Sequence, residues 1–329
     1  MPRRLLACLA APVVIAAVVA GCAGSDDPAP TSTAQPGGST SAAADSHGEG
    51  PSSTAPPSAD TRPLLAAACA GTASVRTAAT LPDHLTSVSG LASSRRHPGV
   101  IWAIEDSLEP PVVTALDLDG RVLAEVRIDG PLFTNVDWED LALGPGPDGA
   151  PWLHVADIGD NLGIRREVRV FRFPEPALQD ATIEAETVTL RYEEGRPNAE
   201  ALLVDAQGVT WVIDKEPDGP ATVLRADEDD VLRAAGQLDL PGEQVTAVDL
   251  SADGRVLALR TVEQLRLYPV ADGAALPDVV AGDPCEAPPL DERQGESAAF
   301  LLDGSGVLTV SEDESGQPVD LHVTGPTGA

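Results

Sequence analysis

Three short stretches place a glutamate where an apolar run begins: DWEDLALG from Asp137, PNAEALLVD from Pro197 and QGESAAFLLDG from Gln294. A carboxylate at the end of a buried strand costs free energy unless a hydrogen bond, a basic group or a cation compensates it. Carboxylates that meet at one place can bind a hard cation such as Ca²⁺, which takes oxygen ligands. The recurrence of Glu139, Glu200 and Glu296 at equivalent points therefore predicts a shared acidic site.

These stretches belong to a repeat that predicts the fold. Each repeat has a short apolar run, a turn rich in Gly, Asp or Pro, and a second apolar run, the pattern of a β-hairpin. Four strands per repeat at a period near 50 residues are typical of a propeller blade. We expect an all-β fold, a five-bladed β-propeller; the alternative, a six-bladed ring, needs a repeat that we do not find. The repeats begin at Ser89, Glu139, Glu200, Thr246 and Glu296, with intervals of 50, 61, 46 and 50 residues.

The N-terminus carries an export signal. Arg3 and Arg4 precede an apolar stretch over residues 5–20, which is short for a membrane span and is flanked like a secretory signal. Residues 19–22, Val-Ala-Gly-Cys, resemble the lipobox of bacterial lipoproteins, which implies cleavage before Cys22 and a lipid on its sulfur. A plain secretory signal and an uncleaved anchor are the alternatives. We expect a signal peptide over 1–21, a disordered tether rich in Ser, Thr, Pro, Gly and Ala over 22–62, and the propeller over 63–329.

The ring is expected to close with a strand from the N-terminal side. Only 33 residues follow Glu296, which is room for three strands, and the stretch 69–82 has no repeat of its own. A strand from this stretch would complete the last blade and cover its exposed edge. Two cysteines, Cys69 and Cys285, remain in the propeller region, and an exported protein meets an oxidising compartment. We predict that they form a disulfide where the ring closes.

The propeller places the acidic positions at one mouth of its central channel. The first strand of each blade lines the channel, and the second runs antiparallel beside it. The first residue of the first strand and the last residue of the second strand therefore lie at the same end of the channel. Six acids and two bases should converge, and Asp160 and Asn161 would add oxygen donors just past the rim. The predicted facing pairs are Ser89 with Asp106, Glu139 with Asp157, Glu200 with Lys215, Thr246 with Arg260, and Glu296 with Glu312.

Carboxylates outnumber basic groups at this mouth. Lys215, the only lysine of the chain, and Arg260 would offset two of the six acids. The remaining repulsion favours a divalent cation, and calcium fits the oxygen donors best. For each acid alone, a structural role is the alternative, because carboxylates at strand ends also accept hydrogen bonds from turn amides or pair with arginines.

Several classes of chemistry are disfavoured. A formal net charge of −31 argues against binding to nucleic acid. The histidines lack the spacing of a zinc motif, no sequence matches a nucleophile elbow, and no glycine-rich loop opens a helix for a phosphate. We expect a monomeric lipoprotein on the extracytoplasmic face of the cell membrane, held there through Cys22, whose partner is a small polar ligand or an envelope protein.

The motifs SGLA, DWEDLALGPG, VADIGDN, AEALLVD and QGESAAF, which span most of residues 86–312, resemble a group of exported bacterial propellers. The chain is more distantly similar to the esterase-like phytase and the regucalcin or gluconolactonase propellers. That similarity implies carboxylates at the channel mouth that bind a divalent cation and support hydrolysis. A site that binds only a metal would not need basic groups such as Lys215 and Arg260. These two residues would instead hold an anionic ligand or fix the acids in place.

Three functions remain open from the sequence. The first is a lipid-anchored propeller that binds a cation and a small polar or sugar-like ligand. The second is a metal-assisted hydrolase of phosphate esters, lactones or other esters, with Glu200 or Glu296 as the base. The third is a protein-interaction scaffold of the cell envelope with a sealed channel.

Overall fold

The computed structural model describes residues 60–106, 109–129, 135–216, 219–313, 315 and 317–328. The predicted signal peptide, Cys22 and the tether up to residue 59 lie outside these residues. The all-β prediction is confirmed, since strands dominate the described chain and its two helices are short, α1 (Arg62–Cys69) and α2 (Leu276–Val280). Neither of these helices is long and apolar enough to cross a membrane.

The strands form antiparallel groups that follow the sequence order. The first group is β2 (Val88–Ser93), β3 (Val100–Glu105), β4 (Val112–Asp117) and β5 (Val122–Asp129), to which β9 (Ala181–Glu184) adds in parallel. The second is β6 (Trp138–Pro145), β7 (Pro151–Asp157), β8 (Glu167–Pro174) and β10 (Glu186–Tyr192). The third is β11 (Ala199–Val204), β12 (Thr210–Asp214), β13 (Ala221–Ala226) and β14 (Val231–Leu238).

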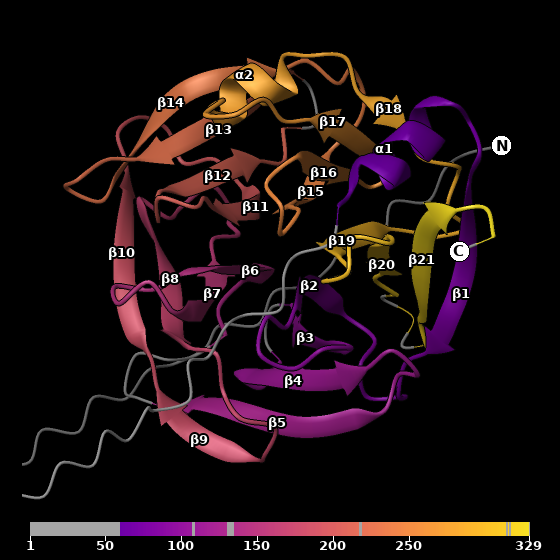
Figure 1. Ribbon diagram of the computed structural model, residues 1–329. Coiled ribbons are helices and arrows are strands. Elements are labelled where there is room, and N and C mark those ends of the chain that lie inside the picture. Colours follow the sequence, from indigo (N-terminus) through magenta and orange to yellow (C-terminus); the bar gives the residue numbers. More distant parts are fainter. Residues whose placement is uncertain are drawn as a thin grey trace, which may run out of the picture. The chain divides into compact units, whose positions relative to one another are not determined.

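Two further groups complete the arrangement. One is β15 (Val245–Leu250), β16 (Val256–Thr261), β17 (Leu265–Pro269) and β18 (Cys285–Glu286). The other is β19 (Gly295–Phe300), β20 (Val307–Ser311), β21 (Asp320–Pro326) and, from the N-terminal side, β1 (Ala73–Thr80). The innermost strands β2, β6, β11, β15 and β19 contact one another in this order, and β19 contacts β2. Figure 1 shows them around a common centre, with the outer strands at the periphery. This radial arrangement of antiparallel sheets is a β-propeller.

The core lies between neighbouring sheets. The innermost strands β11 and β19 are buried along their whole length, and their small residues fit the crowded centre where the strands converge. Larger side chains fill the space between sheets, as in the cluster that joins the first and second groups, where the rings of Trp138 on β6 and Phe171 on β8 have centroids 6.2 Å apart. All four tryptophans are buried, so they stabilise the packing of the sheets.

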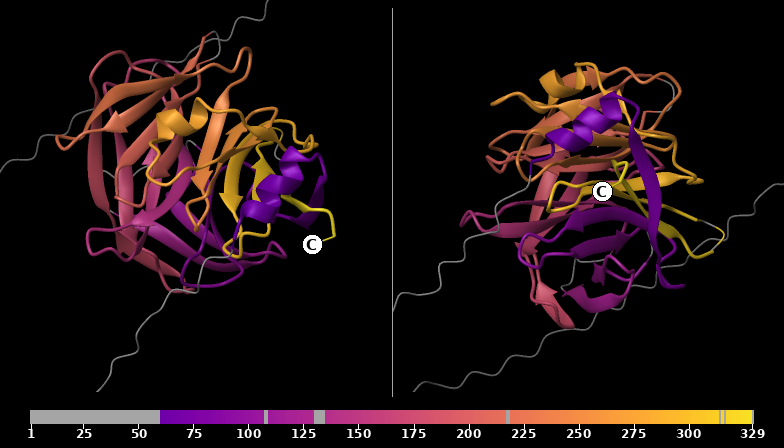
Figure 2. Two further views of the ribbon diagram at one scale, coloured as in Figure 1. Left: turned by 45° about the horizontal axis from the view of Figure 1, so that its top comes forward. Right: turned by 45° about the vertical axis from the view of Figure 1, so that its right-hand side comes forward.

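The N-terminal segment completes the last sheet. Strand β1 pairs with β21 in antiparallel register from Ala73 opposite Pro326 to Thr80 opposite Asp320, and Figure 2 shows this indigo strand beside the yellow C-terminal strands. The predicted disulfide between Cys69 and Cys285 is present, with Cα atoms 4.7 Å apart. The closing strand is shorter than the stretch 69–82 from which it was predicted, because Cys69 is the last residue of helix α1 and β1 begins at Ala73.

Helix α1 forms because Pro63 suits a first turn and the alanine-rich run that follows has high helix propensity. The helix buries Leu64, Ala67 and Ala68 against the sheet β15–β18. Just before the helix, Thr61 Oγ1 donates a hydrogen bond of 2.9 Å to Asp253 Oδ1. The segment is therefore fixed to the sheet β15–β18 by apolar packing, a hydrogen bond and the disulfide.

Candidate functional site

A shift of register marks the same position in each innermost strand. Each innermost strand pairs with the next strand of its group, and near the start of the innermost strand one residue is skipped, as in a β-bulge. This holds for β2, β6, β11, β15 and β19. A bulge adds an unpaired residue and re-aims its side chain. The five bulge positions are buried and coincide with the first residues of the sequence repeats, which are Ser89, Glu139, Glu200, Thr246 and Glu296.

Lys215 joins two of these glutamates across the channel. Its Nζ lies 3.2 Å from Glu200 Oε2 and 3.8 Å from Glu296 Oε1. The two glutamates come from β11 and β19, which are separated in the ring by β15, so the lysine reaches over the centre of the mouth. We define the mouth cluster as Asp106, Asp137, Glu139, Glu200, Glu296 and Glu312 together with Lys215.

Glu139 and Glu200 are joined by a hydrogen bond between their carboxyl groups, which requires a proton. Burial, followed by the negative charges of Glu200 and Asp106, raises the pKa of Glu139 well above its ordinary value. Burial also raises the pKa of Glu200, although Lys215 opposes that shift. Because the lysine stabilises a negative Glu200, the shared proton resides on Glu139.

Asp106, Asp137 and Glu139 form the tightest group of acids. One oxygen from each lies within 4.8 Å of the other two. Two oxygens on opposite sides of a Ca²⁺ ion, each at about 2.4 Å, are separated by about 4.8 Å. The three carboxylates are therefore close enough to share one ion. Sequence reasoning had omitted Asp137 from the site, although it stands two residues before Glu139 in the motif DWED.

Asn135 positions two of these acids. Its side-chain amide donates to the carbonyl oxygens of Glu105, at 2.9 Å, and Asp106, while its Oδ1 accepts the backbone N–H of Trp138 at 3.1 Å. The end of β3 and the start of β6 are thereby fastened together. Asp137 is held from the other side, since its backbone N–H donates to Asp157 Oδ1 at 3.1 Å.

Gly159 leaves room for the carboxyl groups. A Cβ atom at this position would lie 2.1 Å from Glu139 Oε1 and 2.5 Å from Asp137 Oδ2, so no larger residue fits without displacing both acids. The motif VADIGDN contains this glycine, and its close approach to the acids explains why a glycine stands in the loop after β7.

We expect Gly159→Ala to weaken divalent-cation binding by about tenfold or more, because the added methyl group pushes Glu139 and Asp137 apart. The chain should still fold, since the collision is with side-chain atoms. Isothermal titration with Ca²⁺ and circular dichroism measure the two properties. Gly219→Ala is the matched control, as its added Cβ meets nothing nearer than 3.5 Å. Unchanged affinity in Gly159→Ala would contradict the placement of the site.

Glu296 and Glu312 are linked through Gln294. The Gln294 amide nitrogen lies 2.6 Å from Glu296 Oε1 and 2.7 Å from Glu312 Oε2. Burial raises the pKa of Glu296 to about 7, with Lys215 opposing the shift and Glu200 adding to it. This carboxyl group is therefore partly protonated at neutral pH.

The remaining predicted residues lie around the cluster in supporting contacts. Asp157 pairs with Arg165 at 3.0 Å. Asp160 accepts the backbone N–H groups of Ile164 and Arg165, which shapes the loop after β7. Asn161 Oδ1 accepts from Asn198, which also donates to Glu200 Oε1 at 2.9 Å.

Arg260 balances a different acid from the one expected. Its Nη2 lies 2.5 Å from Glu292 Oε2, and its guanidinium packs on Gly295, where a Cβ would lie 1.6 Å from Nη2. Glu292 also contacts Thr309 and His322, so this buried network joins β16 to the last sheet. Thr246, the predicted partner of Arg260, donates instead to the Gly295 carbonyl at 2.8 Å. Each predicted first member is itself the bulge residue and has no directly facing partner; Thr246, for example, stands between the pairs Val245–Thr261 and Ala247–Arg260.

Two further acids inside the channel have a structural role that sequence reasoning missed. Asp140 Oδ2 accepts the backbone N–H of Leu202 at 2.8 Å, and Asp249 Oδ2 accepts that of Phe300 at 2.7 Å. Each carboxylate thus links one innermost strand to the next. Burial raises the pKa of Asp249 to about 6 and that of Asp140 well above its ordinary value.

The raised pKa values predict how stability depends on pH. The pKa of Glu296 rises from 4.5 to about 7 on folding, so the folded chain retains a proton that the unfolded chain releases. This stabilisation is complete below the unfolded pKa and is lost as the pH rises through the folded one. In the presence of a chelator, we expect the free energy of unfolding to fall between about pH 5 and pH 7.5, by on the order of 3 kcal/mol from Glu296 alone.

Urea denaturation at several pH values measures this dependence. The variant Glu296→Gln, whose amide does not titrate, should show a smaller loss over the same range. A free energy of unfolding that rises between pH 5 and pH 7.5 would show that the buried carboxyl groups do not titrate as described.

No known family model matches the chain, and no curated protein matches its sequence. Its fold is similar to several solved structures. The PQQ-bound aldose sugar dehydrogenase of Streptomyces coelicolor is 14% identical over 77% of this chain and 98% of that chain, with a TM-score of 0.44. The periplasmic gluconolactonase PpgL of Pseudomonas aeruginosa is 16% identical over 73% and 85%, with a TM-score of 0.39, and U3-55K is 10% identical over 76% and 98%, also at 0.39.

Proposed function

We propose that this chain is a five-bladed propeller whose channel mouth binds one divalent cation, calcium, through Asp106, Asp137 and Glu139. The observation that carries the proposal is the grouping of three carboxylate oxygens within 4.8 Å of one another. The blade number is supported by the five innermost strands and their common bulge, and the described residues contribute no sixth innermost strand.

The chemistry of the cluster suits a hard cation. Its donors are carboxylate oxygens, which Ca²⁺ prefers, and no thiol or imidazole takes part in the group of three. A bound ion would displace the proton that Glu139 shares with Glu200, since metal ligands must be deprotonated. Lys215 then lies in the other half of the mouth, where its positive charge compensates the negative charges of Glu200 and Glu296. A small polar ligand would reach the ion from the open side of the mouth.

We also propose that the chain works at the extracytoplasmic face of the membrane, attached by a lipid on Cys22 and a tether over residues 22–62. The lipobox-like sequence at residues 19–22 supports the anchor, and the disulfide between Cys69 and Cys285 suits an oxidising compartment. Labelling of cells with a radioactive fatty acid tests the anchor. Label should enter the chain and be absent after Cys22→Ser; label that persists in this variant would exclude attachment at Cys22.

Equilibrium dialysis of the purified chain against ⁴⁵Ca²⁺ tests the cation site. We expect one ion per chain, lost when Glu139, Glu200 and Glu296 are changed together to glutamine. The matched control changes three exposed glutamates to glutamine, Glu125, Glu167 and Glu184, and should retain the ion. Absence of a retained ion from the unaltered chain would refute the proposal and leave the scaffold as the better hypothesis.

A metal-assisted hydrolase is a second candidate, because Glu296, at the same mouth as the proposed ion, has a pKa of about 7. A bound cation would polarise the oxygen of an ester or phosphate. Glu296 would accept a proton from the attacking water as its oxygen bonds to carbon or phosphorus, and it would return that proton to the leaving alcohol oxygen as the original ester bond breaks. Turnover of a panel of chromogenic esters, lactones and phosphates, abolished by a chelator and by Glu296→Gln, would support this activity. Ion binding without turnover of any member would favour the binding function.

A further inference from the structure

A cavity of about 710 Å³ opens between the second and third strand groups. It lies at the opposite end of the strands from the mouth cluster, since Pro145 at the end of β6 lines it whereas Glu139 lies at the start of that strand. None of its lining residues belongs to the mouth cluster. Its volume is within the range of about 300 to 1,000 Å³ that is usual for small-molecule sites.

The pairing of two outer strands builds this cavity. Strands β10 and β14 form a short parallel pair, Arg191 with Val231 and Tyr192 with Leu232, which joins the two groups into one eight-stranded sheet. The strands diverge beyond this pair, and the turn 227–230 between β13 and β14 forms a rim of the space that they leave. The cavity is therefore bounded by paired strands and a turn.

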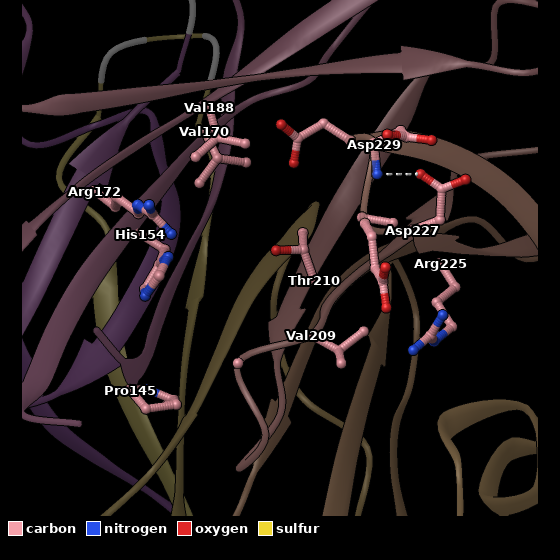
Figure 3. A pocket seen from close by; sticks show the side chains of 14 residues that line it. Pro145, His154, Val170, Arg172, Val188, Val209, Thr210, Arg225, Asp227 and Asp229 are labelled. Atoms are coloured by element: carbon pink, nitrogen blue, oxygen red, sulfur yellow. Dashed lines mark hydrogen bonds between the residues drawn. The ribbon is translucent and has the colours of Figure 1, made fainter. Parts of the chain in front are cut away.

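The turn 227–230 carries carboxylates in a fixed conformation. Asp227 Oδ1 accepts the backbone N–H groups of Asp229 and Val231, each at 2.9 Å, and Asp230 adopts a φ of 57°. The carboxylates of Glu228, Asp229 and Asp230 make no hydrogen bond or ion pair with the described residues. Figure 3 shows the labelled Asp229 projecting into the space toward Val170 and Val188. The carboxylates on this rim can therefore bind a positively charged group.

The opposite wall carries positive charge. Arg172 on β8 uses its Nε to bind Glu186 at 3.0 Å, and its terminal guanidinium nitrogens have no hydrogen-bond partner in the described chain. Figure 3 shows it above His154, its partner across β7 and β8, on the side of the cavity away from the turn. A guanidinium with two free N–H groups is suited to bidentate binding of a carboxylate.

His154 leaves a buried polar atom without a partner at this wall. The residue is 4% exposed, and its Nε2 has no hydrogen bond within the described residues. Burial, with the positive charge of Arg172, lowers the pKa of His154 to about 4, so the ring is neutral at pH 7. This nitrogen lies beside Gly144 of β6, so the wall holds a buried polar atom whose lost hydrogen bond costs free energy.

We propose that this cavity binds a short zwitterionic peptide, with its C-terminal carboxylate on Arg172 and its N-terminal ammonium at the carboxylates of the turn 227–230. Arg172 on one wall and the carboxylates of the turn on the other match a ligand with a negative and a positive end, while Arg225, which also lines the cavity, lies over the ring of Trp211. A sugar is less well suited, because no aromatic side chain lines the cavity and Trp211 nearby is covered by Arg225, 5.7 Å from its ring centroid. This binding is independent of the cation proposed at the mouth.

Equilibrium dialysis of the full chain against a random tripeptide library, quantified by mass spectrometry, tests the proposal. The library is used with free ends, with acetylated N-termini, and with amidated C-termini. We expect the free form to be retained at least tenfold better than either blocked form. Arg172→Gln should reduce retention of the free form about tenfold and abolish its advantage over the amidated form.

Two controls separate this site from other effects. Arg121→Gln removes an exposed arginine that pairs with Asp117 and Asp119, and it should leave tripeptide binding unchanged. Glu139→Gln, at the mouth, should also leave it unchanged, so the two proposals can fail separately. Equal retention of the free and blocked libraries, or no retention of any of them, would overturn the proposal. So would unaltered binding by a folded Arg172→Gln variant.

Discussion

Changing Cys69 and Cys285 together to serine is expected to lower the free energy of unfolding by about 4 kcal/mol. The bond closes a loop across a sequence separation of 216 residues, so its loss gives the unfolded chain a large increase in conformational freedom. In the native state the bond fixes helix α1 to β18. Helix α1 precedes β1, the strand that completes the last sheet, and β18 precedes β19, the innermost strand of that sheet.

Urea denaturation of the double variant, compared with the oxidised chain, measures this loss. Reduction of the unaltered chain with dithiothreitol should reproduce it, which controls for effects of the serine side chains. A difference below about 1 kcal/mol would mean that the contacts of β1 and α1 close the ring without covalent help.

Glu139→Gln should weaken calcium binding by at least about 100-fold, corresponding to about 2.7 kcal/mol. The substitution removes one of the three grouped carboxylates and replaces a charged oxygen ligand by an amide. The fold should be retained, because the protonated Glu139 is already neutral and the glutamine amide can donate a hydrogen bond to Glu200 in its place. The variant without calcium should therefore be as stable as the unaltered chain at pH 7.5, or more stable.

Isothermal titration calorimetry with Ca²⁺ and thermal unfolding without it measure both effects. Glu125→Gln, an exposed glutamate on β5, is the matched control and should change neither property. Unaltered calcium affinity in Glu139→Gln would exclude this residue as a ligand. A large loss of stability would instead indicate that its carboxylate has a structural role.

Much of the fold follows from the sequence because each repeat contains its own turn and apolar pattern. Ser89, Glu139, Glu200, Thr246 and Glu296 were identified as equivalent by that pattern, and they occupy equivalent bulge positions. Local periodicity and turn chemistry determine such features. The closing strand was predictable for a different reason, since the last sheet lacked a strand and the N-terminal stretch had no other place.

The partners of the site residues were harder to predict. A bulge is not visible in the apolar pattern, and the first residue of each repeat proves to be the bulge residue, which has no directly facing partner. Arg260 forms its ion pair with Glu292, a loop residue whose position depends on the tertiary arrangement. Asp137 lies outside the repeat itself, and only the contact between the end of β3 and the start of β6 brings it to Asp106. Contacts between different sheets determine such groupings.

The cavity beside the turn 227–230 also depends on tertiary structure. Its two walls come from β7 and β8 on one side and from the turn between β13 and β14 on the other. The parallel pairing of β10 with β14 has no signal in either strand alone. Charged residues such as Arg172 and Asp229 appear as ordinary surface residues until the sheets are placed next to each other.

Anomalous diffraction from crystals grown with Mn²⁺, an ion that also takes carboxylate ligands, tests the central claim most directly. We predict one anomalous peak at the channel mouth, within about 2.6 Å of carboxylate oxygens of Asp106, Asp137 and Glu139. Lys215 should remain between Glu200 and Glu296 in that structure. A mouth without a peak, in crystals grown with the ion at millimolar concentration, would contradict the account, as would a peak bound only by other residues.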